Sequence, residues 1–340
     1  MGVTATAPGK LFLLGEYAVL HGAPALLAAM DARCRINLEP ADCWRVTARP
    51  LGLSELILAD DGAIPAEASD DVRRALTVFD AVRRTVATES ELRPLQVTID
   101  TTAFFRGGHK LGLGASAAVA VALTAGLHRL LGHPDDPATV CNTATAAHRL
   151  AQGGEGSGAD VATATHGGIV EFAAGRPAQP RAWPAGLHAR PVMTGNGADT
   201  RELVAAVRRL ATTDPTGHAA AIRRLADLAD QGRAAVIRSD IPGLLTACRA
   251  SLEALATLGV AAGADIVTAQ HRALAAAVAE TGAVFKTTGA GGGDLGLILA
   301  ASPSVMEAAR RAAEALGHTC PPLAFGAGGV AVTDVSATVR

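Results

Sequence analysis

The sequence of 340 residues lacks the features that mark several broad classes of protein. No stretch reaches the roughly 18 uninterrupted apolar residues of a membrane helix. The nearest one, residues 117–131, is interrupted by Gly126, His128 and Arg129. The formal net charge is only −2, so no excess of one charge points to nucleic acid or to a membrane surface. No basic segment precedes an apolar one near the N-terminus, and we therefore expect a cytoplasmic protein.

Cysteine is scarce and shows no pairing pattern. The five cysteines are odd in number, lie far apart and form no C-x-x-C pair: Cys34, Cys43, Cys141, Cys248 and Cys320. This spacing favours reduced, mostly buried thiols of a cytoplasmic protein over disulfides or a zinc site.

The chain does contain enough apolar residues to fold. With 49% hydrophobic residues it can bury a sizeable core, and its length fits about two domains. A stretch rich in proline and glycine, residues 174–186, predicts the boundary between them. We therefore expect one domain over residues 1–180 and a second over residues 181–340.

Apolar periodicity and turn residues predict the elements of both domains. In the first, strands are expected at residues 3–7, 11–17, 34–38, 44–48, 95–101 and 167–172, with a turn at Pro8 and Gly9 between the first two. Helices are expected there at residues 69–87, 116–131 and 137–152. The second is expected to contain helices at 200–211, 218–239, 241–257, 263–281 and 303–316, and strands at 283–287, 295–300 and 329–332. Helices combined with small sheets indicate the α+β class.

Lysine is the rarest basic residue. Lys10, Lys110 and Lys286 are the only three lysines, whereas the other 27 of the 30 basic residues are arginine. Each lysine adjoins a glycine-rich segment. An ammonium group is a compact point charge that fits a crowded phosphate site. We predict that the three lysines converge on phosphate groups; the alternative is coincidence in a glycine-rich chain.

The segment from Gly112 to Ser116 has the composition of an anion-binding loop that opens a helix. Glycine frees the backbone N–H groups at a helix start, and the helix dipole adds positive potential. A helix cap made of small residues is the structural alternative. A dinucleotide-binding fingerprint is disfavoured, because Asp135 and Asp136 follow a turn where they would cap the next helix. The P-loop pattern is absent, because Leu11 follows Lys10.

Two further glycine-rich segments stand out. Residues 289–293 lie between two expected strands, which indicates backbone held close to a ligand or another loop, or else a flexible hairpin. Residues 156–160 end in Asp160, which is either a helix N-cap or a functional carboxylate.

Taken in order, these segments resemble the motifs of the GHMP kinase superfamily, small-molecule kinases that include mevalonate and phosphomevalonate kinases. The first motif matches residues 7–20 (APGKLFLLGEYAVL), the phosphate loop matches residues 110–118 (KLGLGASAA), and the third motif matches residues 286–294 (KTTGAGGGD). The resemblance spans essentially the whole chain. It implies a two-domain fold, with a ribosomal-S5-like N-terminal domain and a ferredoxin-like C-terminal domain.

Residues 147–162 (AHRLAQGGEGSGADVA) are most like phosphomevalonate kinases, as is Asp294 at the end of the third motif. Tyr17 to Gly22 look more like a mevalonate kinase. The resemblance therefore implies ATP- and Mg²⁺-dependent phosphorylation of phosphomevalonate, giving diphosphomevalonate and ADP in isoprenoid biosynthesis. The alternatives are an alcohol acceptor, as in mevalonate kinase or another GHMP kinase, and a non-catalytic ligand-binding homologue. The partner expected is a small anionic molecule, with neither nucleic acid nor membrane.

The same resemblance implies roles for individual residues. Lys10 and Asp160 would be catalytic, and Ser116 would contact the metal. The ATP phosphates would be held by Lys110, Gly112, Leu113, Gly114, Ala115, Ser116 and Ala117. The substrate would be bound by Lys10, His148, Arg149, Ser157, Gly158, Thr288, Gly289, Ala290 and Gly291.

This chain departs from the family pattern at three places. Ala115 replaces the first serine of the phosphate loop, and Gly154 stands where phosphomevalonate kinases often carry a lysine. The metal-binding glutamate of mevalonate kinases has no carboxylate counterpart near His148; Glu155 is the nearest substitute.

Overall fold

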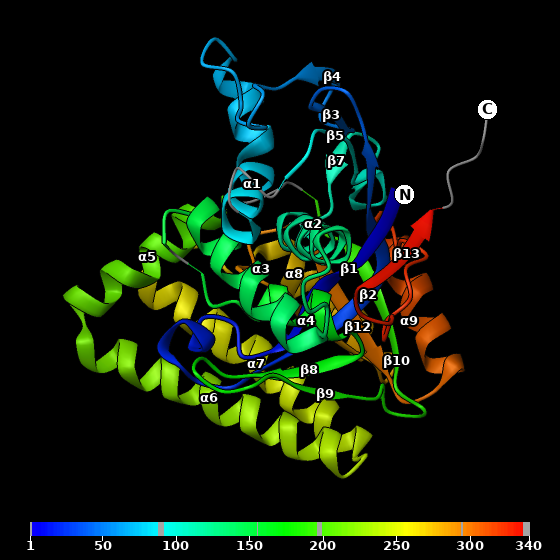
Figure 1. Cartoon of the computed structure of the whole chain (residues 1–340). Helices are drawn as coiled ribbons and strands as arrows, with labels where there is room; N and C mark the ends of the chain where they lie inside the picture. The colour runs from blue at the N-terminus through cyan, green and yellow to red at the C-terminus, as the bar shows by residue number, and fades with distance from the viewer. Residues whose placement is uncertain (1, 88–91, 155, 196–198, 294, 336–340) are drawn as a thin grey trace. The chain divides into compact units, whose positions relative to one another are not determined.

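The computed structural model describes residues 2–87, 92–154, 156–195, 199–293 and 295–335, and it divides the chain into two compact units (Figure 1). Unit 1 comprises Met1–Lys10, Ala29–Gly167 and Ala327–Arg340. Unit 2 comprises Leu11–Ala28 and Gly168–Gly326. The sequence predicted one division near residue 180, whereas the units are made of separate segments. The reason is that the first two strands run from one unit into the other, which a change in composition along the chain cannot reveal.

Unit 1 contains a mixed sheet with strand order β13-β1-β2-β5-β3-β4. β3 and β5 are parallel, while β1 with β13, β2 with β5 and β3 with β4 are antiparallel. The strands are β1 (Gly2–Leu14), β2 (Ala25–Pro40), β3 (Arg45–Arg49), β4 (Leu53–Ile57), β5 (Leu95–Asp100) and β13 (Ala331–Val335). A short hairpin, β6 (Phe105–Arg106) and β7 (His109–Lys110), follows the 3₁₀ helix η2 (Thr102–Phe104).

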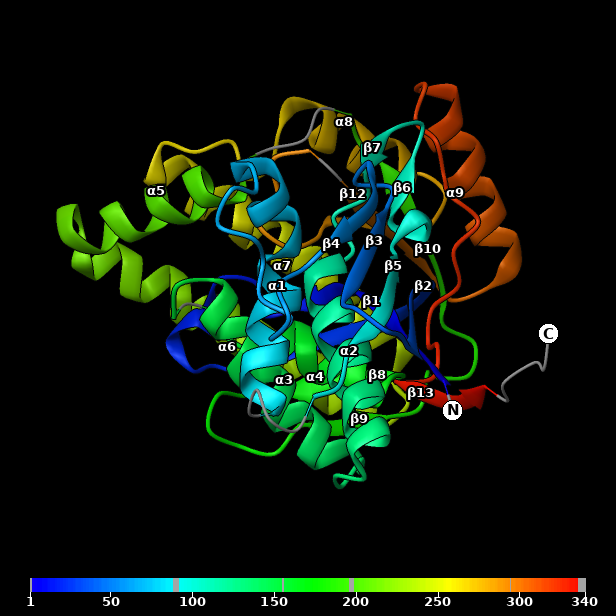
Figure 2. The ribbon, with the colours of Figure 1, turned by 45° about the horizontal axis from the view of Figure 1, so that its top comes forward.

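Four helices of unit 1 pack against one another (Figure 2). They are α1 (Asp70–Val86), α2 (Ala115–Leu131), α3 (Pro137–Ala151) and α4 (Ala159–His166). Helix α2 is apolar on all sides and buried over most of its length, which is typical of a central core helix. Helix α3 begins where Asp136 accepts hydrogen bonds from the N–H groups of Ala138 and Thr139, so the predicted cap is confirmed.

The predicted turn at Pro8 and Gly9 is wrong, because β1 continues through both residues. Glycine is needed there for close packing: a Cβ on Gly9 would lie 2.9 Å from the carbonyl oxygen of Leu113. The next residue, Lys10, donates its N–H to that same oxygen at 2.8 Å. The Gly9 position therefore lets the segment before α2 approach the strand.

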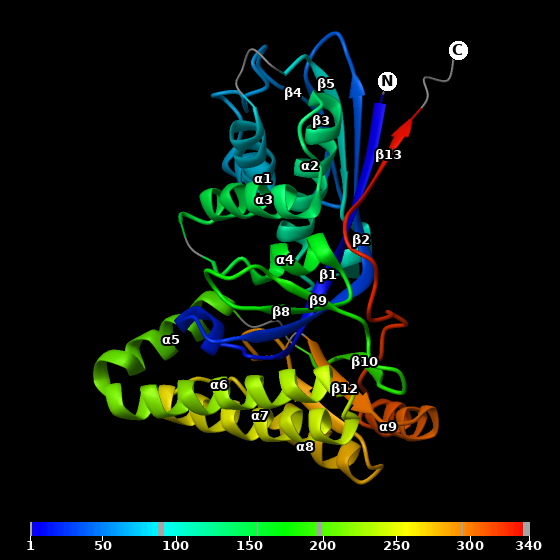
Figure 3. The same ribbon diagram turned by 60° about the horizontal axis from the view of Figure 1, so that its bottom comes forward.

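Unit 2 contains an antiparallel sheet of order β10-β12-β11, formed by β10 (His188–Met193), β12 (Leu295–Ala300) and β11 (Val284–Thr287). In addition, β8 (Ile169–Phe172) pairs with β9 (Gln179–Arg181) and with the first residues of β2. The 3₁₀ helix η1 (Ala18–His21) precedes β2. The α-helices of unit 2 are α5 (Thr200–Thr213), α6 (Pro215–Ile237), α7 (Ile241–Ala262), α8 (Ala269–Ala279) and α9 (Pro303–Ala315). Figure 3 shows α6 and α7 side by side. The predicted α+β class is confirmed.

Among the predicted helices, α8 differs most at its start, since it begins at Ala269 rather than near Gly263. Gly263 ends α7 in a left-handed conformation, and Thr268 caps α8 through the N–H of His271. The residues between the two helices are therefore not helical. One of them, Ile266, offers its carbonyl oxygen to Gly292 of the third glycine-rich segment.

Helix α7 is, within the described part of the chain, the one helix long and apolar enough to cross a membrane by length and composition. Its residues Leu244, Cys248 and Leu255 are buried in the apolar clusters of unit 2. The apolar character of α7 thus has an explanation in the packing of this unit. All five cysteines are free thiols; Cys34 and Cys248 are buried and the other three are partly exposed.

Candidate active site

The start of α2 has the geometry of an anion-binding loop. Gly112 and Gly114 adopt left-handed φ angles of 68° and 75°, which only glycine accepts without strain. Gly114 is the N-cap of α2, and no side chain caps the helix. The N–H groups of the first turn, at Ala115, Ser116 and Ala117, have no partner within the helix and can meet an anion. The predicted nest is thus present in unit 1.

Lys10 lies directly over this loop. A Cβ on Gly114 would be only 2.9 Å from Cε of Lys10, so the lysine stem runs across the glycine. The backbone of Lys10 is fixed by its bond to Leu113. The loop and β1 are therefore held together by both the main chain and the side chain of this residue.

Asp160 faces Lys10 from α4. Its Oδ2 lies 3.3 Å from Nζ of Lys10, with side-chain exposures of 32% for Asp160 and 11% for Lys10. The alternative in which Asp160 caps its helix is wrong, because Gly158 is the N-cap and Asp160 is the second helical residue. Because the carboxylate is partly exposed, a ligand can approach the pair.

His148 joins this group from α3. Its Nε2 is 3.1 Å from Oγ of Ser116, and the side-chain amide of Gln152 lies 3.4 Å from the same nitrogen. Burial lowers the pKa of His148; the Asp160 carboxylate acts against this shift and the Lys10 ammonium adds to it. The imidazole is therefore neutral at pH 7. Lys10, Ser116, His148 and Asp160 therefore come together from β1, α2, α3 and α4.

Two predicted substrate residues, Ser157 and Gly158, lie in the loop that leads into α4, and a third, Arg149 of α3, binds that loop. Arg149 donates from Nε to the carbonyl of Gly156 at 3.2 Å and from Nη2 to that of Ser157 at 3.1 Å. The hydroxyl of Ser157 accepts from the N–H of Ala159. Gly158 adopts φ 90° immediately before the helix. Arg149 thus uses two of its five N–H donors to hold this loop. Its contact with the substrate stays a prediction.

Lys110 and Lys286 have very different surroundings. Lys110 is exposed in the hairpin just before the loop, in unit 1. Lys286 lies in unit 2 and its side chain is 0% exposed, with Nζ 2.5 Å from Oε1 of Glu16 and 2.5 Å from the carbonyl of Thr287. A buried ammonium that is already paired cannot contact a phosphate, so the predicted convergence of three lysines on phosphates is wrong for Lys286.

The third glycine-rich segment belongs to unit 2 and is bound to other segments of that unit. The Thr288 hydroxyl accepts from the N–H of Phe12 at 2.9 Å and donates to its carbonyl at 3.1 Å. The Ala290 carbonyl accepts from the Tyr17 hydroxyl at 2.7 Å. Gly289 and Gly291 have φ angles of 68° and 80°. The predicted approach of this backbone to another loop is confirmed; Asp294 and Glu155 lie outside the described residues.

The residues present fit the ATP and Mg²⁺ that the motifs imply. Mg²⁺ binds oxygen ligands and is usually held by one or two protein groups together with substrate phosphates. The Ser116 hydroxyl at the helix start provides one such oxygen. No group of three or more His, Cys, Asp or Glu side chains able to hold a metal occurs among the residues with described positions.

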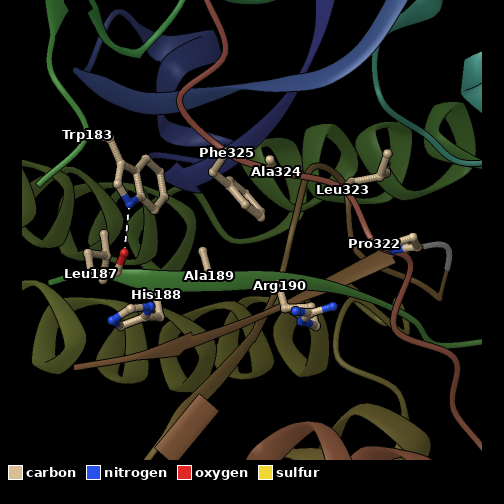
Figure 4. A pocket seen from close by; sticks show the side chains of 9 residues that line it. All are labelled: Trp183, Leu187, His188, Ala189, Arg190, Pro322, Leu323, Ala324 and Phe325. Carbon is tan, nitrogen blue, oxygen red and sulfur yellow. Dashed lines mark hydrogen bonds between the residues drawn. The ribbon is translucent and has the colours of Figure 1, made fainter. Parts of the chain in front are cut away.

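A separate pocket of about 380 Å³ lies in unit 2 between β10 and residues 322–325 (Figure 4). Trp183 and Phe325 stack there with ring centroids 5.3 Å apart, and the indole N–H donates to the Leu187 carbonyl at 2.8 Å. None of the predicted site residues lines it. We assign it no part in the chemistry.

Two residues that bind the third glycine-rich segment were not predicted from the sequence. Glu16 and Tyr17 lie in the first motif, yet no role was predicted for either. A carboxylate in an otherwise apolar strand-like segment was the available signal for Glu16, because such a residue is rarely buried without a partner.

Comparisons with known proteins agree with the motifs. Residues 74–168 match the family described as the GHMP kinases N terminal domain, a range that includes α2, α3 and Asp160. A phosphomevalonate kinase from a Streptomyces species is 26% identical, over 86% of this chain and 88% of its own length. A mevalonate kinase from Thermococcus sibiricus is 31% identical over 62% of both chains, so the present chain spans about three fifths of that relative.

The fold is also found among solved structures. The phosphomevalonate kinase of Streptococcus pneumoniae, in complex with phosphomevalonate and AMPPNP, superposes with a TM-score of 0.79 at 20% identity, covering 95% of this chain and 99% of that one. The resemblance inferred from the three motifs, and the two-domain fold it implies, are confirmed.

Proposed function

We propose that this chain, a member of the GHMP kinase superfamily, transfers the γ-phosphoryl group of ATP to phosphomevalonate, giving diphosphomevalonate and ADP. The observation that carries the proposal is the Lys10–Asp160 pair, 3.3 Å apart, beside the uncapped start of α2. Phosphoryl transfer depends mainly on positioning and charge stabilisation, and this arrangement offers N–H donors and an ammonium group together. A cytoplasmic location and a small anionic acceptor are part of the same proposal.

The residues of unit 1 divide the work as follows. The N–H groups of the α2 start bind the ATP phosphates, and Lys110 adds positive charge from the preceding hairpin. The Ser116 hydroxyl, 3.1 Å from Nε2 of His148, would be the protein ligand of Mg²⁺, which would neutralise phosphate charge when bound. Lys10 lies over the loop and stabilises the charge on the transferring group.

The acceptor decides what Asp160 does. A phosphomonoester has a second pKa of about 6, so its oxygen is already ionised at neutral pH. That oxygen attacks the γ-phosphorus, the bond from γ-phosphorus to the β–γ bridging oxygen breaks, and ADP leaves with the electron pair. No proton needs to be removed, and Asp160 then serves mainly to orient Lys10. His148, Arg149, Ser157 and Gly158 are the residues of unit 1 proposed to contact the acceptor.

An alcohol acceptor is the second candidate, and one observation favours it. The Asp160 carboxylate is partly exposed beside the Lys10 ammonium group, so the hydroxyl of an alcohol can approach it as a base. The 31% identity to a mevalonate kinase is in line with this candidate.

Coupled ADP release with mevalonate, its 5-phosphate, homoserine and galactose separates the candidates. We expect turnover with the 5-phosphate and recovery of the transferred phosphate as an acid-labile diphosphate. A stable monoester made from mevalonate would support the alcohol candidate instead. Lys10→Met is expected to reduce kcat on the 5-phosphate far more than Asp160→Asn. A loss of many orders of magnitude in Asp160→Asn alone, on that acceptor, contradicts the proposed role of Asp160.

A further inference from the structure

Unit 2 contains a fully buried ion pair between two segments that are 270 positions apart in the sequence. The side chains of Lys286 and Glu16 are 0% and 1% exposed. Removing two charges from water is unfavourable, and an apolar pair of similar volume is often as stable. The second carboxylate oxygen of Glu16, Oε2, also has no hydrogen-bond partner among the described residues. Stability alone therefore does not explain this pair.

The same two segments are joined by further hydrogen bonds, and all of them converge on the third glycine-rich segment. Phe12 binds the Thr288 hydroxyl through both its N–H and its carbonyl, and Tyr17 donates to the Ala290 carbonyl. Tyr17 does so from a φ of 60°, which is strained for a residue other than glycine. Residues 12–17 therefore fix positions 286, 288 and 290.

Gly291 and Gly292 of the third glycine-rich segment are held by the loop before α8. Gly292 donates its N–H to the Ile266 carbonyl at 3.0 Å, and a Cβ on Gly291 would lie 2.3 Å from that oxygen. By contrast, a Cβ on Gly289 would meet no atom within 4 Å. The segment is thus fixed on both sides while Gly289 borders open space.

We propose that Glu16, Lys286 and Tyr17 are positioning residues that hold residues 288–291 in the conformation that receives the acceptor, with Gly289 at the contact surface. This inference rests on the proposed function, because it assumes that residues 288–291 bind the acceptor. The first motif then has a second role in addition to that of Lys10. Its residues Glu16 and Tyr17 hold residues 288–291 in place within unit 2.

Steady-state kinetics and hydrogen–deuterium exchange on the full chain test the inference. Tyr17→Phe removes one hydroxyl, and Glu16→Gln removes one charge and keeps the shape. We expect KM for phosphomevalonate to rise about three- to tenfold in Tyr17→Phe and about 10- to 100-fold in Glu16→Gln. These ranges follow from the usual free energies of neutral and charged hydrogen bonds. KM for ATP is expected to stay within about twofold of wild type, and amides of residues 287–293 to exchange faster.

The matched control is Arg233→Gln, which removes ion pairs with Asp230 at 3.1 Å and Glu171 at 3.7 Å, all in the same unit and more exposed than Lys286 and Glu16. It is expected to leave both KM values and the exchange of residues 287–293 unchanged. A merely structural role for Glu16 and Tyr17 predicts lower thermal stability with an unchanged acceptor KM, and that result overturns the inference. If Glu16→Gln does not fold, Tyr17→Phe decides alone.

Failure of the proposed function can be distinguished from failure of the positioning inference. Wild-type protein that turns over none of the acceptors overturns that function, while the exchange measurement still reports on positioning. Unchanged exchange of residues 287–293 in Tyr17→Phe overturns the positioning itself, whatever the acceptor is.

Discussion

Replacing Lys286 by methionine should destabilise unit 2 strongly. The substitution leaves the Glu16 carboxylate buried with neither oxygen paired, because Oε1 binds Lys286 and Oε2 has no partner among the described residues. Breaking a buried ion pair by removing one partner destabilises a protein by about 3–5 kcal/mol. That loss is a large part of a typical stability of roughly 5–15 kcal/mol.

The double variant provides the sharper test. Glu16→Leu combined with Lys286→Met leaves apolar side chains of similar length in place of both charges. We expect this protein to be more stable than either single variant, by about 2 kcal/mol or more, because no unpaired charge remains buried.

Urea unfolding gives the free energies of the cycle for all four proteins and thermal unfolding gives their Tm values, both followed by circular dichroism. Unit 2 has roughly 180 residues, for which 1 kcal/mol shifts Tm by about 2–4 °C. The single variant Lys286→Met should therefore lose about 6–20 °C. The reasoning fails if the double variant is destabilised by the sum of the two single changes, or if Lys286→Met loses less than about 1 kcal/mol.

Three further variants test other parts of the structure. Gly114→Ala places a Cβ 2.9 Å from Cε of Lys10 at φ 75°, so we expect kcat to fall at least about tenfold; unchanged kcat would contradict the placement of Lys10 over the loop. Gly291→Ala places a Cβ 2.3 Å from the Ile266 carbonyl oxygen, so KM for the acceptor should rise about tenfold while KM for ATP does not change. Equal effects on both KM values would contradict a role of residues 288–291 in binding the acceptor. Burial lowers the pKa of His271 from 6.5 to about 4, so the unfolded chain binds the extra proton first as pH falls. Between pH 7 and pH 5, wild type should therefore lose about 2 kcal/mol more stability than His271→Gln; equal losses would refute this account.

The phosphate loop could be predicted because its cause is local. Glycines at the two left-handed positions and a run of small apolar residues after them determine both the loop and the start of α2. The predicted helix began at residue 116, and the structure begins it at Ala115. Cap residues such as Asp136 were predictable for the same reason, since a cap depends on residues within three positions of it.

The surroundings of Lys286 could not be predicted, because they depend on a residue 270 positions away. Nothing near Lys286 in the sequence indicates that Glu16 lies beside it. The continuous strand β1 was missed for a related reason. Glycine serves both turns and close contacts, and only the approach of Leu113 shows which use applies to Gly9.

Lys10 and Lys286 each lie close to glycine in the sequence, and comparing them shows what decides whether an ammonium group meets a ligand. Both Lys10 and Lys286 are paired with a carboxylate, so pairing alone does not separate them. Exposure does: the carboxylate paired with Lys10 is 32% exposed, whereas that paired with Lys286 is 1% exposed. An incoming phosphate can therefore approach the first pair and share its ammonium, whereas reaching the second would require opening the core of unit 2. The same residue type in a similar glycine-rich setting is therefore proposed to bind phosphate in one unit and to position a loop in the other.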